Sequence, residues 1–253
     1  MTTWLLLILS GLLSGVLAGF LGIGGGTILV PLQIALGYPP VQAVATSSLA
    51  IAITAISGTV QNWRMGYINA RRVILLGLPA LLTAQLGVYL ANIFPPKIIL
   101  IAFGLLLLLN IYLVELRKRL SRKNVQNQPQ KLNPVIARIL TGGSAGILAG
   151  LFGVGGGVIM VPLQILLLAE PIKVAIQTSL GVIVITAISA TIGHAISENI
   201  LFLEGLILGL GGLVGVQIST RFLPKLSDQF VSFAFRFLLA VLSVYIFWQA
   251  WQI

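Results

Sequence analysis

Apolar residues fill this chain in long runs that polar residues interrupt only briefly. Such runs approach or exceed the ~20 residues that an α-helix needs to cross the hydrocarbon layer of a membrane. Strands of a membrane barrel would instead be short, with alternating apolar and polar residues. We therefore expect an all-α integral membrane protein. Its apolar segments are predicted at about 4–37, 41–60, 73–92, 97–115, 136–168, 172–193, 201–222 and 229–250.

One glycine-rich stretch occurs twice. Residues 11–33 and 142–164 are offset by 131 positions and are identical at fourteen of twenty-three of them. The similarity continues between AVATSSL at 43–49 and VAIQTSL at 174–180. This duplication predicts two homologous units of about four segments each. We expect a first transmembrane repeat at 1–115, a basic cytoplasmic linker at 116–134 and a second transmembrane repeat at 135–253.

The first segment of each unit is too long for a single crossing. About 33 residues at ~1.5 Å per residue would span near 50 Å, against a hydrocarbon core of ~30 Å. Each segment is therefore expected to break at its glycines, either as a kinked span or as a hairpin. A hairpin would give each unit an odd number of net crossings and make the two repeats inverted.

Basic residues favour the inverted arrangement. The linker is expected on the cytoplasmic side because it holds a run of Lys and Arg. Inverted repeats place six further basic residues on that side, whereas parallel repeats would leave Arg221 and Lys225 outside. The six are Arg64, Arg71, Arg72, Lys173, Arg221 and Lys225, with Glu198 and His194 on the opposite side.

Composition narrows the function classes. With 58% hydrophobic and 8% charged residues, the chain has too little polar surface to be a soluble domain. The net charge of +10 comes from loop residues that the positive-inside rule explains, so no nucleic-acid partner is expected. The absence of cysteine excludes disulfides and thiolate metal sites. The first apolar run lacks a basic n-region and is interpreted as mature protein.

The triple glycines are the main candidate site. They lack the G-x-G-x-x-G spacing and the Gly-Lys-Ser/Thr of nucleotide-binding loops. A helix restarting at Thr27 or Val158 presents free N–H groups and a partial positive charge, which suit an anion. Matching breaks in two halves are also typical of transporter substrate sites. The alternative is close helix packing, our interpretation for Gly11, Gly15 and Gly19 and their counterparts Gly142, Gly146 and Gly150.

Duplicated polar residues form a second group of candidates. Hydroxyl and amide groups in membrane helices can hydrogen-bond a substrate or tie helices together, and both readings remain open. His194 is read either as an interfacial structural residue or as a gating residue. The expected substrate-binding set is Gly24, Gly25, Gly26, Thr27, Thr46, Ser47, Ser48, Gly155, Gly156, Gly157, Val158, Gln177, Thr178 and Ser179. The expected pathway set is Gln33, Gln164, Gln85, Gln217 and His194.

The five acidic residues all lie at segment ends, at Glu115, Glu170, Glu198, Glu204 and Asp228. No carboxylate is expected at the membrane centre, where proton and sodium relays usually keep one. A negative interior expels an anion with about 2.3 kcal/mol per charge per 100 mV, which favours outward anion movement. Proton coupling through His194 stays open, and no metal or cofactor is expected.

The doubled A-G-x-x-G-x-G-G-G-x-x-x-V-P segment, followed by T-S-S-L or Q-T-S-L, resembles the sulfite exporter TauE/SafE family over essentially the whole chain. The resemblance implies a transporter of small sulfur-containing anions or organic acids in the bacterial inner membrane. The family motif falls on Gly24–Gly26, Pro31, Thr46–Ser48, Gly155–Gly157, Pro162 and Gln177–Ser179. Val158 replaces Thr27 and Gln177 replaces Thr46, so the two half-sites are expected to differ chemically.

We expect a secondary transporter. Its expected partners are a small anion and the lipid bilayer, and a homo-oligomer is left open. A channel-like anion pore and a non-transporting structural subunit are the alternatives. A membrane-embedded enzyme is disfavoured because the sequence offers one histidine, no cysteine and no central carboxylate.

Overall fold

The computed structural model describes residues 2–122 and 133–252. Within these ranges the chain is helical and contains no strand, which confirms the all-α class. The helices are α1 (Thr2–Leu21), α2 (Gly26–Ala35), α3 (Pro40–Arg64), α4 (Ala70–Ile93), α5 (Pro96–Arg122), α6 (Pro134–Phe152), α7 (Gly157–Leu167), α8 (Ile172–Ile196), α9 (Phe202–Phe222) and α10 (Asp228–Gln252), with a 3₁₀ turn η2 (Leu223–Lys225). Part of the expected linker, residues 123–132, lies outside the described ranges.

Seven of the described helices are long and apolar enough to cross a membrane: α1, α3, α4, α6, α8, α9 and α10. Large apolar side chains cover the outside of the bundle, among them Leu82 at 73% exposure and Val244 at 72%. In water such a surface would be unfavourable, but in lipid it faces a matching solvent. The chain is therefore a multi-pass membrane protein, as expected.

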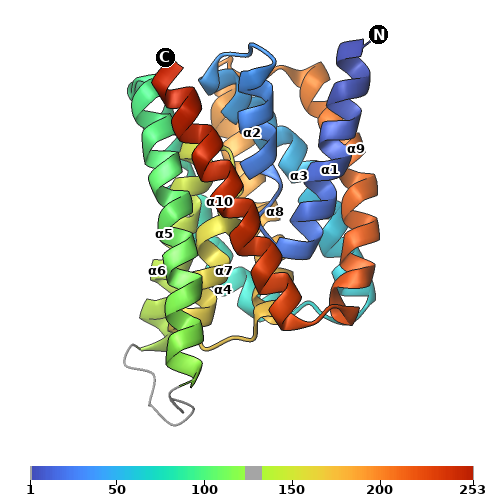
Figure 1. Ribbon diagram of the computed structural model, residues 1–253, viewed down its shortest axis with the longest axis vertical. Coiled ribbons are helices and arrows are strands. Elements are labelled where there is room, and N and C mark those ends of the chain that lie inside the picture. The colour runs from blue at the N-terminus through green and yellow to red at the C-terminus, as the bar shows by residue number, and fades with distance from the viewer. Residues whose placement is uncertain (1, 123–132, 253) are drawn as a thin grey trace.

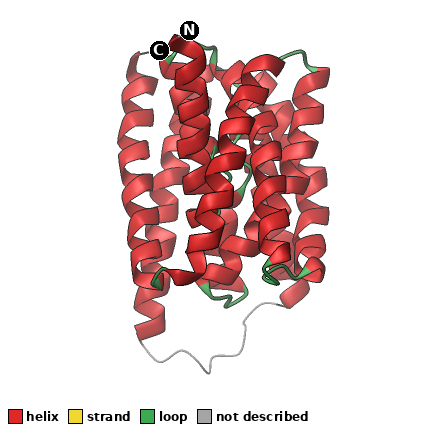
Figure 2. Ribbon diagram, turned by 90° about the vertical axis from the view of Figure 1, so that its right-hand side faces the viewer, coloured by secondary structure: helices red, strands yellow, loops and turns green. Residues whose placement is uncertain are grey.

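The helices lie along one common direction (Figures 1 and 2). α1 begins and α10 ends at the same end of the molecule, whereas α5 ends and α6 begins at the opposite end (Figure 1). α2 turns back toward the end at which α1 begins, and α7 turns back toward the end at which α6 begins (Figure 1). The short helices α2 and α7 thus start in the interior and run toward opposite ends.

Glycines let the long helices approach each other closely. α1 packs against α9, and α6 packs against α4. A Cβ atom added at Gly11 or Gly15 would collide with the backbone of Leu208 or Gly212 on α9. Additions at Gly142, Gly146 and Gly150 would collide with the backbone of α4 in the same way. The packing interpretation of these glycines is confirmed.

Long helices of one half of the chain pack mainly against long helices of the other half. The first long helix of each half packs against the third long helix of the other, α1 against α9 and α6 against α4, and α3 packs against α8 in the middle. Further apolar packing joins α5 to α10, and Phe103 of α5 stacks on Phe152 of α6 with ring centroids 5.2 Å apart. The candidate residues are therefore held between the two halves of the chain.

Candidate functional site

The two glycine runs form short loops in the interior. α1 ends at Leu21 and α2 begins at Gly26, with Gly25 at φ 79°. α6 ends at Phe152 and α7 begins at Gly157, with Gly156 at φ 77°. A left-handed residue directly before a helix strongly favours glycine, because a Cβ would be strained there. A Cβ at either position would also clash, with Ser14 on α1 and with Ala145 on α6 respectively.

The two loops are in direct contact across the halves. A Cβ added at Gly26 would collide with the carbonyl oxygen of Gly153, and one added at Gly157 would collide with that of Gly22. All residues from Gly22 to Gly26 and from Gly153 to Gly157 are buried. The N-termini of α2 and α7 therefore meet at one central place, each against the backbone of the other loop. Two positive helix ends are brought together there.

Two isoleucines close the centre from the sides. Ile51 of α3 and Ile183 of α8 are fully buried, and a Cβ added at Gly155 would touch both. Charged side chains are not among the neighbours found around these glycines in the described ranges. The polar groups available at the centre are therefore backbone N–H groups and a few hydroxyls.

Thr27 is the most distinctive hydroxyl at the centre. It lies in the first turn of α2 and is fully buried, and its Oγ1 atom has no hydrogen-bond partner among the described residues. A buried hydroxyl without a partner is costly, so such groups commonly serve a ligand. Val158 occupies the equivalent place in α7 and offers no such group. This is one of the two differences between the halves expected from the sequence, the other being Gln177 in place of Thr46.

The hydroxyls of 46–48 do not converge on the glycines. Thr46 Oγ1 accepts a hydrogen bond of 3.1 Å from the N–H of Leu201, just before α9. Ser47 Oγ accepts one of 2.7 Å from Gln33 Nε2, and Ser48 donates to the carbonyl of Val44 in its own helix at 3.0 Å. These bonds join helices or close a local turn. Gln33 retains a buried Oε1 atom without a partner in the described chain.

The matching residues of the second half are more closely tied to the loops. Ser179 donates a hydrogen bond of 2.8 Å to the carbonyl of Gly22, so it supports the first-half loop from the second half. Thr186 Oγ1 donates to the carbonyl of Gly155 at 3.0 Å. Gln177 and Thr178 are buried on the same helix. Thr186 was not predicted, although its duplication with Thr54 is a signal that could have found it.

Gln85 and Gln217 lie away from this centre and tie the halves together. Gln85 Nε2 donates to the carbonyl and hydroxyl oxygens of Ser189, at 2.6 Å and 2.8 Å. Gln217 Nε2 donates to the same two atoms of Ser57, at 3.1 Å and 2.8 Å. Each glutamine therefore bonds a serine of the other half. Ser57 lies six residues beyond Ile51, about 9 Å along α3.

His194 differs from the interfacial expectation, because its side chain is fully buried inside the protein. Its Nε2 atom lies 3.0 Å from the carbonyl oxygen of Gly150, and its Nδ1 atom has no partner in the described ranges. Asn62 holds the corresponding place in the first half and is also fully buried, with neither side-chain polar atom partnered by a described residue. Asn62 was missed because His and Asn share no obvious sequence signal.

A model of the family described as "Sulfite exporter TauE/SafE" matches residues 7–246. The chain belongs to the TauE/SafE family. Its relatives include probable membrane transporter proteins of Bacillus subtilis: YunE is 24% identical over 98% of both chains, and YjnA is 29% identical over 90% of this chain and 93% of its own. A probable membrane transporter protein of Methanocaldococcus jannaschii is 31% identical over 81% of this chain and 76% of its own. These matches identify a membrane transporter, which fits the bacterial inner membrane.

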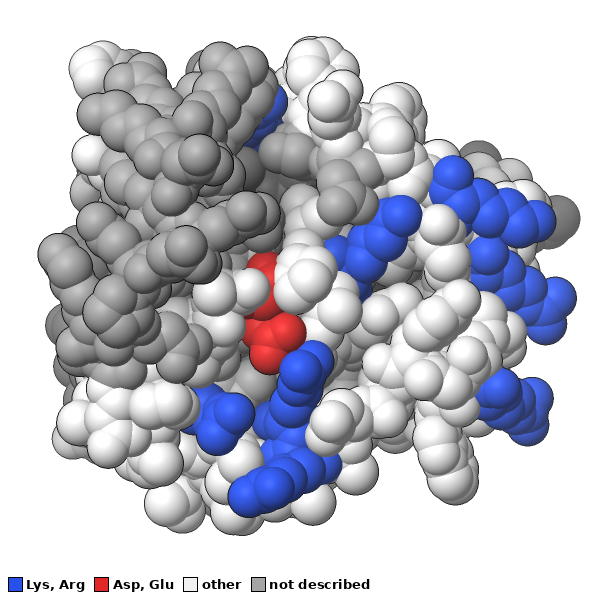
Figure 3. Space-filling view, turned by 90° about the horizontal axis from the view of Figure 1, so that it is seen from below, with Lys and Arg blue, Asp and Glu red and all other residues white. Residues whose placement is uncertain are grey.

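One end of this TauE/SafE protein is basic. Seen from below, Lys and Arg side chains spread over the face, with a smaller acidic patch between them (Figure 3). This end holds the last turn of α3, the first turns of α4 and α6, and the segment after α9 (Figure 1).

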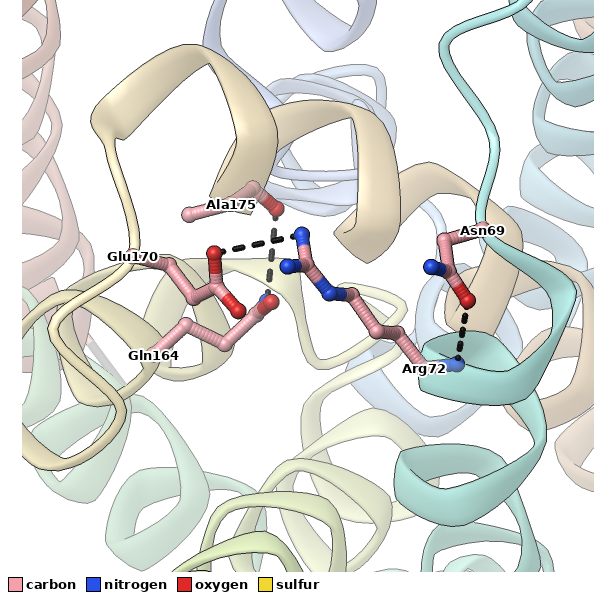
Figure 4. Close-up of polar contacts among 5 residues, drawn as sticks. All are labelled: Asn69, Arg72, Gln164, Glu170 and Ala175. Atoms are coloured by element: carbon pink, nitrogen blue, oxygen red, sulfur yellow. Dashed lines mark hydrogen bonds and ion pairs between the residues drawn. The ribbon is translucent and has the colours of Figure 1, made fainter.

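An ion pair closes part of this basic end. Arg72, in the first turn of α4, lies 3.2 Å from Glu170 in the loop after α7. Figure 4 shows the Arg72 side chain reaching toward Glu170, with Gln164 close by. The Nε2 atom of Gln164 donates to the carbonyl of Ala175 at 3.3 Å, and Asn69 caps α4 by accepting from the Arg72 N–H. The pair joins α4 of one half to the α7–α8 loop of the other.

The opposite end of the TauE/SafE protein carries a tyrosine and a carboxylate instead of an ion pair. Tyr38 lies in the loop between α2 and α3, where burial and, to a lesser degree, the negative charge of Glu204 raise the pKa of its phenol. Glu204 stands near the start of α9, the place that Arg72 takes in α4. Glu204 therefore influences the Tyr38 phenol electrostatically at this end, whereas Arg72 and Glu170 form an ion pair at the other.

Proposed function

We propose that this TauE/SafE protein is a secondary transporter that binds a small anion between the starts of α2 and α7. The observation that carries the proposal is the buried, unpartnered hydroxyl of Thr27 at the place where two helix N-termini meet. Backbone N–H groups in the first turns of α2 and α7 supply further donors. A small anion with several acceptor oxygens and little apolar surface fits such a site best.

The proposed substrate is a sulfur-containing oxyanion or an organosulfonate. The name of the matched family, sulfite exporter, supports this choice. The direction we propose is outward, because an inside-negative potential drives anions out by about 2.3 kcal/mol per charge per 100 mV. The remaining predicted residues, including Ser47, Ser48, Thr178 and Ser179, are proposed to support the site or line its approach.

The proposed transport cycle uses two inverted repeats, residues 1–115 and 135–253, joined by the cytoplasmic linker 116–134. Three observations support this division. The reciprocal Gln–Ser bonds connect equivalent residues of the halves. The Gly26–Gly153 and Gly157–Gly22 contacts are reciprocal as well. α2 and α7 run in opposite directions from the centre (Figure 1). Repeats of this kind suit alternating access around a fixed central site.

A substrate at the centre would be enclosed in this conformation, because the loops touch and both ends carry contacts between the halves. Breaking Arg72–Glu170 would open the route along α7 toward the cytoplasm. Separating the α2–α3 loop from the start of α9 would open the other route. Each opening moves a loop of one half relative to a helix of the other.

Counterflow in liposomes tests the proposed function. Purified protein is reconstituted, the vesicles are loaded with unlabelled sulfite, thiosulfate or sulfoacetate, and uptake of the same labelled anion is followed. We expect uptake to be saturable and to be stimulated by the anion inside, because a carrier returns faster when loaded. Flux without stimulation from the far side would indicate a pore, and flux equal to that of protein-free liposomes would contradict transport.

A further inference from the structure

A groove of about 510 Å³ runs along the outer surface of α9 toward the basic end. Its apolar lining is Leu213, Val214, Ile218 and Phe222, all of which are at least 36% exposed. Its polar lining comprises Gln217, which is engaged with Ser57, and two cations, Arg221 and Lys225. The lining residues of the groove lie on α9 and the following 3₁₀ turn, outside the central glycine loops.

The two positive charges of the groove lie together at one of its ends. Leu213 and Val214 lie near the middle of α9, whereas Arg221 falls in its last turn and Lys225 closes the following 3₁₀ turn. The Lys225 ammonium group lies 5.4 Å from the centroid of the Phe222 ring, a distance that allows a cation–π contact. The ligand that fits has a negative head near the cytoplasmic surface and an apolar body directed into the membrane.

The equivalent place in the other half lacks the charge. A second groove of about 390 Å³ lies between α4 and α8 and is lined by Leu81, Gln85, Ile185, Ile188, Ser189 and Ile192. Leu81 and Gln85 match Leu213 and Gln217 in the duplicated sequence, so the two grooves overlap at these two positions. The α4–α8 groove has an apolar lining and no cation. Lipid binding to the α9 groove can therefore be compared with binding to the α4–α8 groove, which lacks the charges of Arg221 and Lys225.

We propose that the α9 groove binds one anionic phospholipid of the cytoplasmic leaflet. Its phosphate contacts Arg221 and Lys225, and an acyl chain lies along Val214, Ile218 and Phe222. A free inorganic anion would leave the apolar lining unused, and an uncharged lipid would leave both cations unused. Basic pockets at the cytoplasmic ends of membrane helices bind anionic headgroups by this combination. Each cation is expected to strengthen binding about fivefold.

Native mass spectrometry of the full chain tests this proposal. The protein is released from micelles that contain equal amounts of phosphatidylglycerol and phosphatidylcholine with identical acyl chains. The wild type is expected to retain phosphatidylglycerol preferentially. Arg221→Gln combined with Lys225→Gln should lower that preference about 25-fold, since two contributions of about fivefold are lost.

A matched charge control separates the groove from general attraction. Arg71→Gln combined with Arg138→Gln removes the same charge from the same end but leaves the groove intact, so its lipid preference should equal that of the wild type. Ile218→Trp, which fills the groove while keeping both cations, should lower retention of phosphatidylglycerol. Equal preference in the wild type and the Arg221/Lys225 variant, or an equal loss in the control, would overturn the proposal.

Discussion

At the scale of single residues, equivalent positions of the two halves differ in their hydrogen-bond partners. Ser179 and Ser48 occupy equivalent places, but Ser179 supports the loop of the other half and Ser48 bonds to its own helix. Thr46, which sequence alone placed beside them, instead accepts from the N–H of Leu201. That partner lies 155 residues away in the chain, so no local pattern could have predicted it. Thr27 remains without a partner in the described structure.

The contrast between the two serines gives the first stability prediction. Ser179→Ala should lower the free energy of unfolding by about 1–3 kcal/mol, because it leaves the buried carbonyl of Gly22 without its hydrogen bond. Ser48→Ala should have a smaller effect, since its bond lies within one helix and the Val44 carbonyl keeps its helical position. Thermal unfolding in detergent measures both. Equal losses in the two variants would contradict the assigned role of Ser179.

At the scale of helices, the sequence predicts lengths and breaks better than partners. Apolar runs predict the long helices because the bilayer sets the required length. The four-residue spacing of Gly11, Gly15 and Gly19 predicts a packing face. Neither pattern shows that α1 packs against α9 of the other half, since such pairing depends on how complete surfaces fit. The same limit applies to Asn62 and Thr186, whose surroundings come from other helices.

The ion pair between α4 and the α7–α8 loop leads to a prediction about accessibility. The chain contains no cysteine, so Gln164→Cys introduces a single thiol just behind the Arg72–Glu170 pair. Labelling of this thiol by a membrane-impermeant maleimide, added from the cytoplasmic side, should be slow. Adding Arg72→Gln should speed it several-fold, because the ion pair with Glu170 is lost and the contact between the halves weakens.

Arg71→Gln is the matched control for this experiment, since Arg71 is adjacent, equally charged and not part of the pair. It should leave the labelling rate unchanged. An unchanged rate in Arg72→Gln would show that the ion pair does not restrict access to Gln164.

At the scale of the whole molecule, the two halves are held together by reciprocal contacts, as expected for halves related by a two-fold axis, and the proposed inversion of the repeats rests on other observations. The sequence supports this arrangement only indirectly, through loop charges, because a duplicated sequence reads the same in parallel and inverted repeats. Figure 1 adds a geometric argument for the proposal: α1 begins and α10 ends at one end of the molecule, and α5 ends and α6 begins at the other. The proposed lipid-binding groove on α9 and the uncharged groove between α4 and α8 differ because the sequences of the two halves differ.

Topology follows from this arrangement as a testable result. A reporter placed after Ile253 should lie outside the cytoplasm, and one inserted in the 123–132 segment should lie inside it. The reason is that α10 ends at the opposite end from the linker-flanking ends of α5 and α6 (Figure 2). Paired fusions to alkaline phosphatase and green fluorescent protein give the measurement. Both reporters in the cytoplasm would contradict inverted repeats.

The central claim is that an anion binds at the start of α2, and Thr27→Val tests it most directly. Sulfite, thiosulfate, sulfate, sulfoacetate and carboxylates are screened for thermal stabilisation of the purified protein. Thr141→Val is the control, because it also removes a fully buried hydroxyl, one that bonds only within α6. For the anion that stabilises the wild type best, Thr27→Val should weaken binding about tenfold to a hundredfold, as expected for losing a hydrogen bond to a charged group. Unchanged affinity in Thr27→Val, or an equal loss in Thr141→Val, would contradict the site.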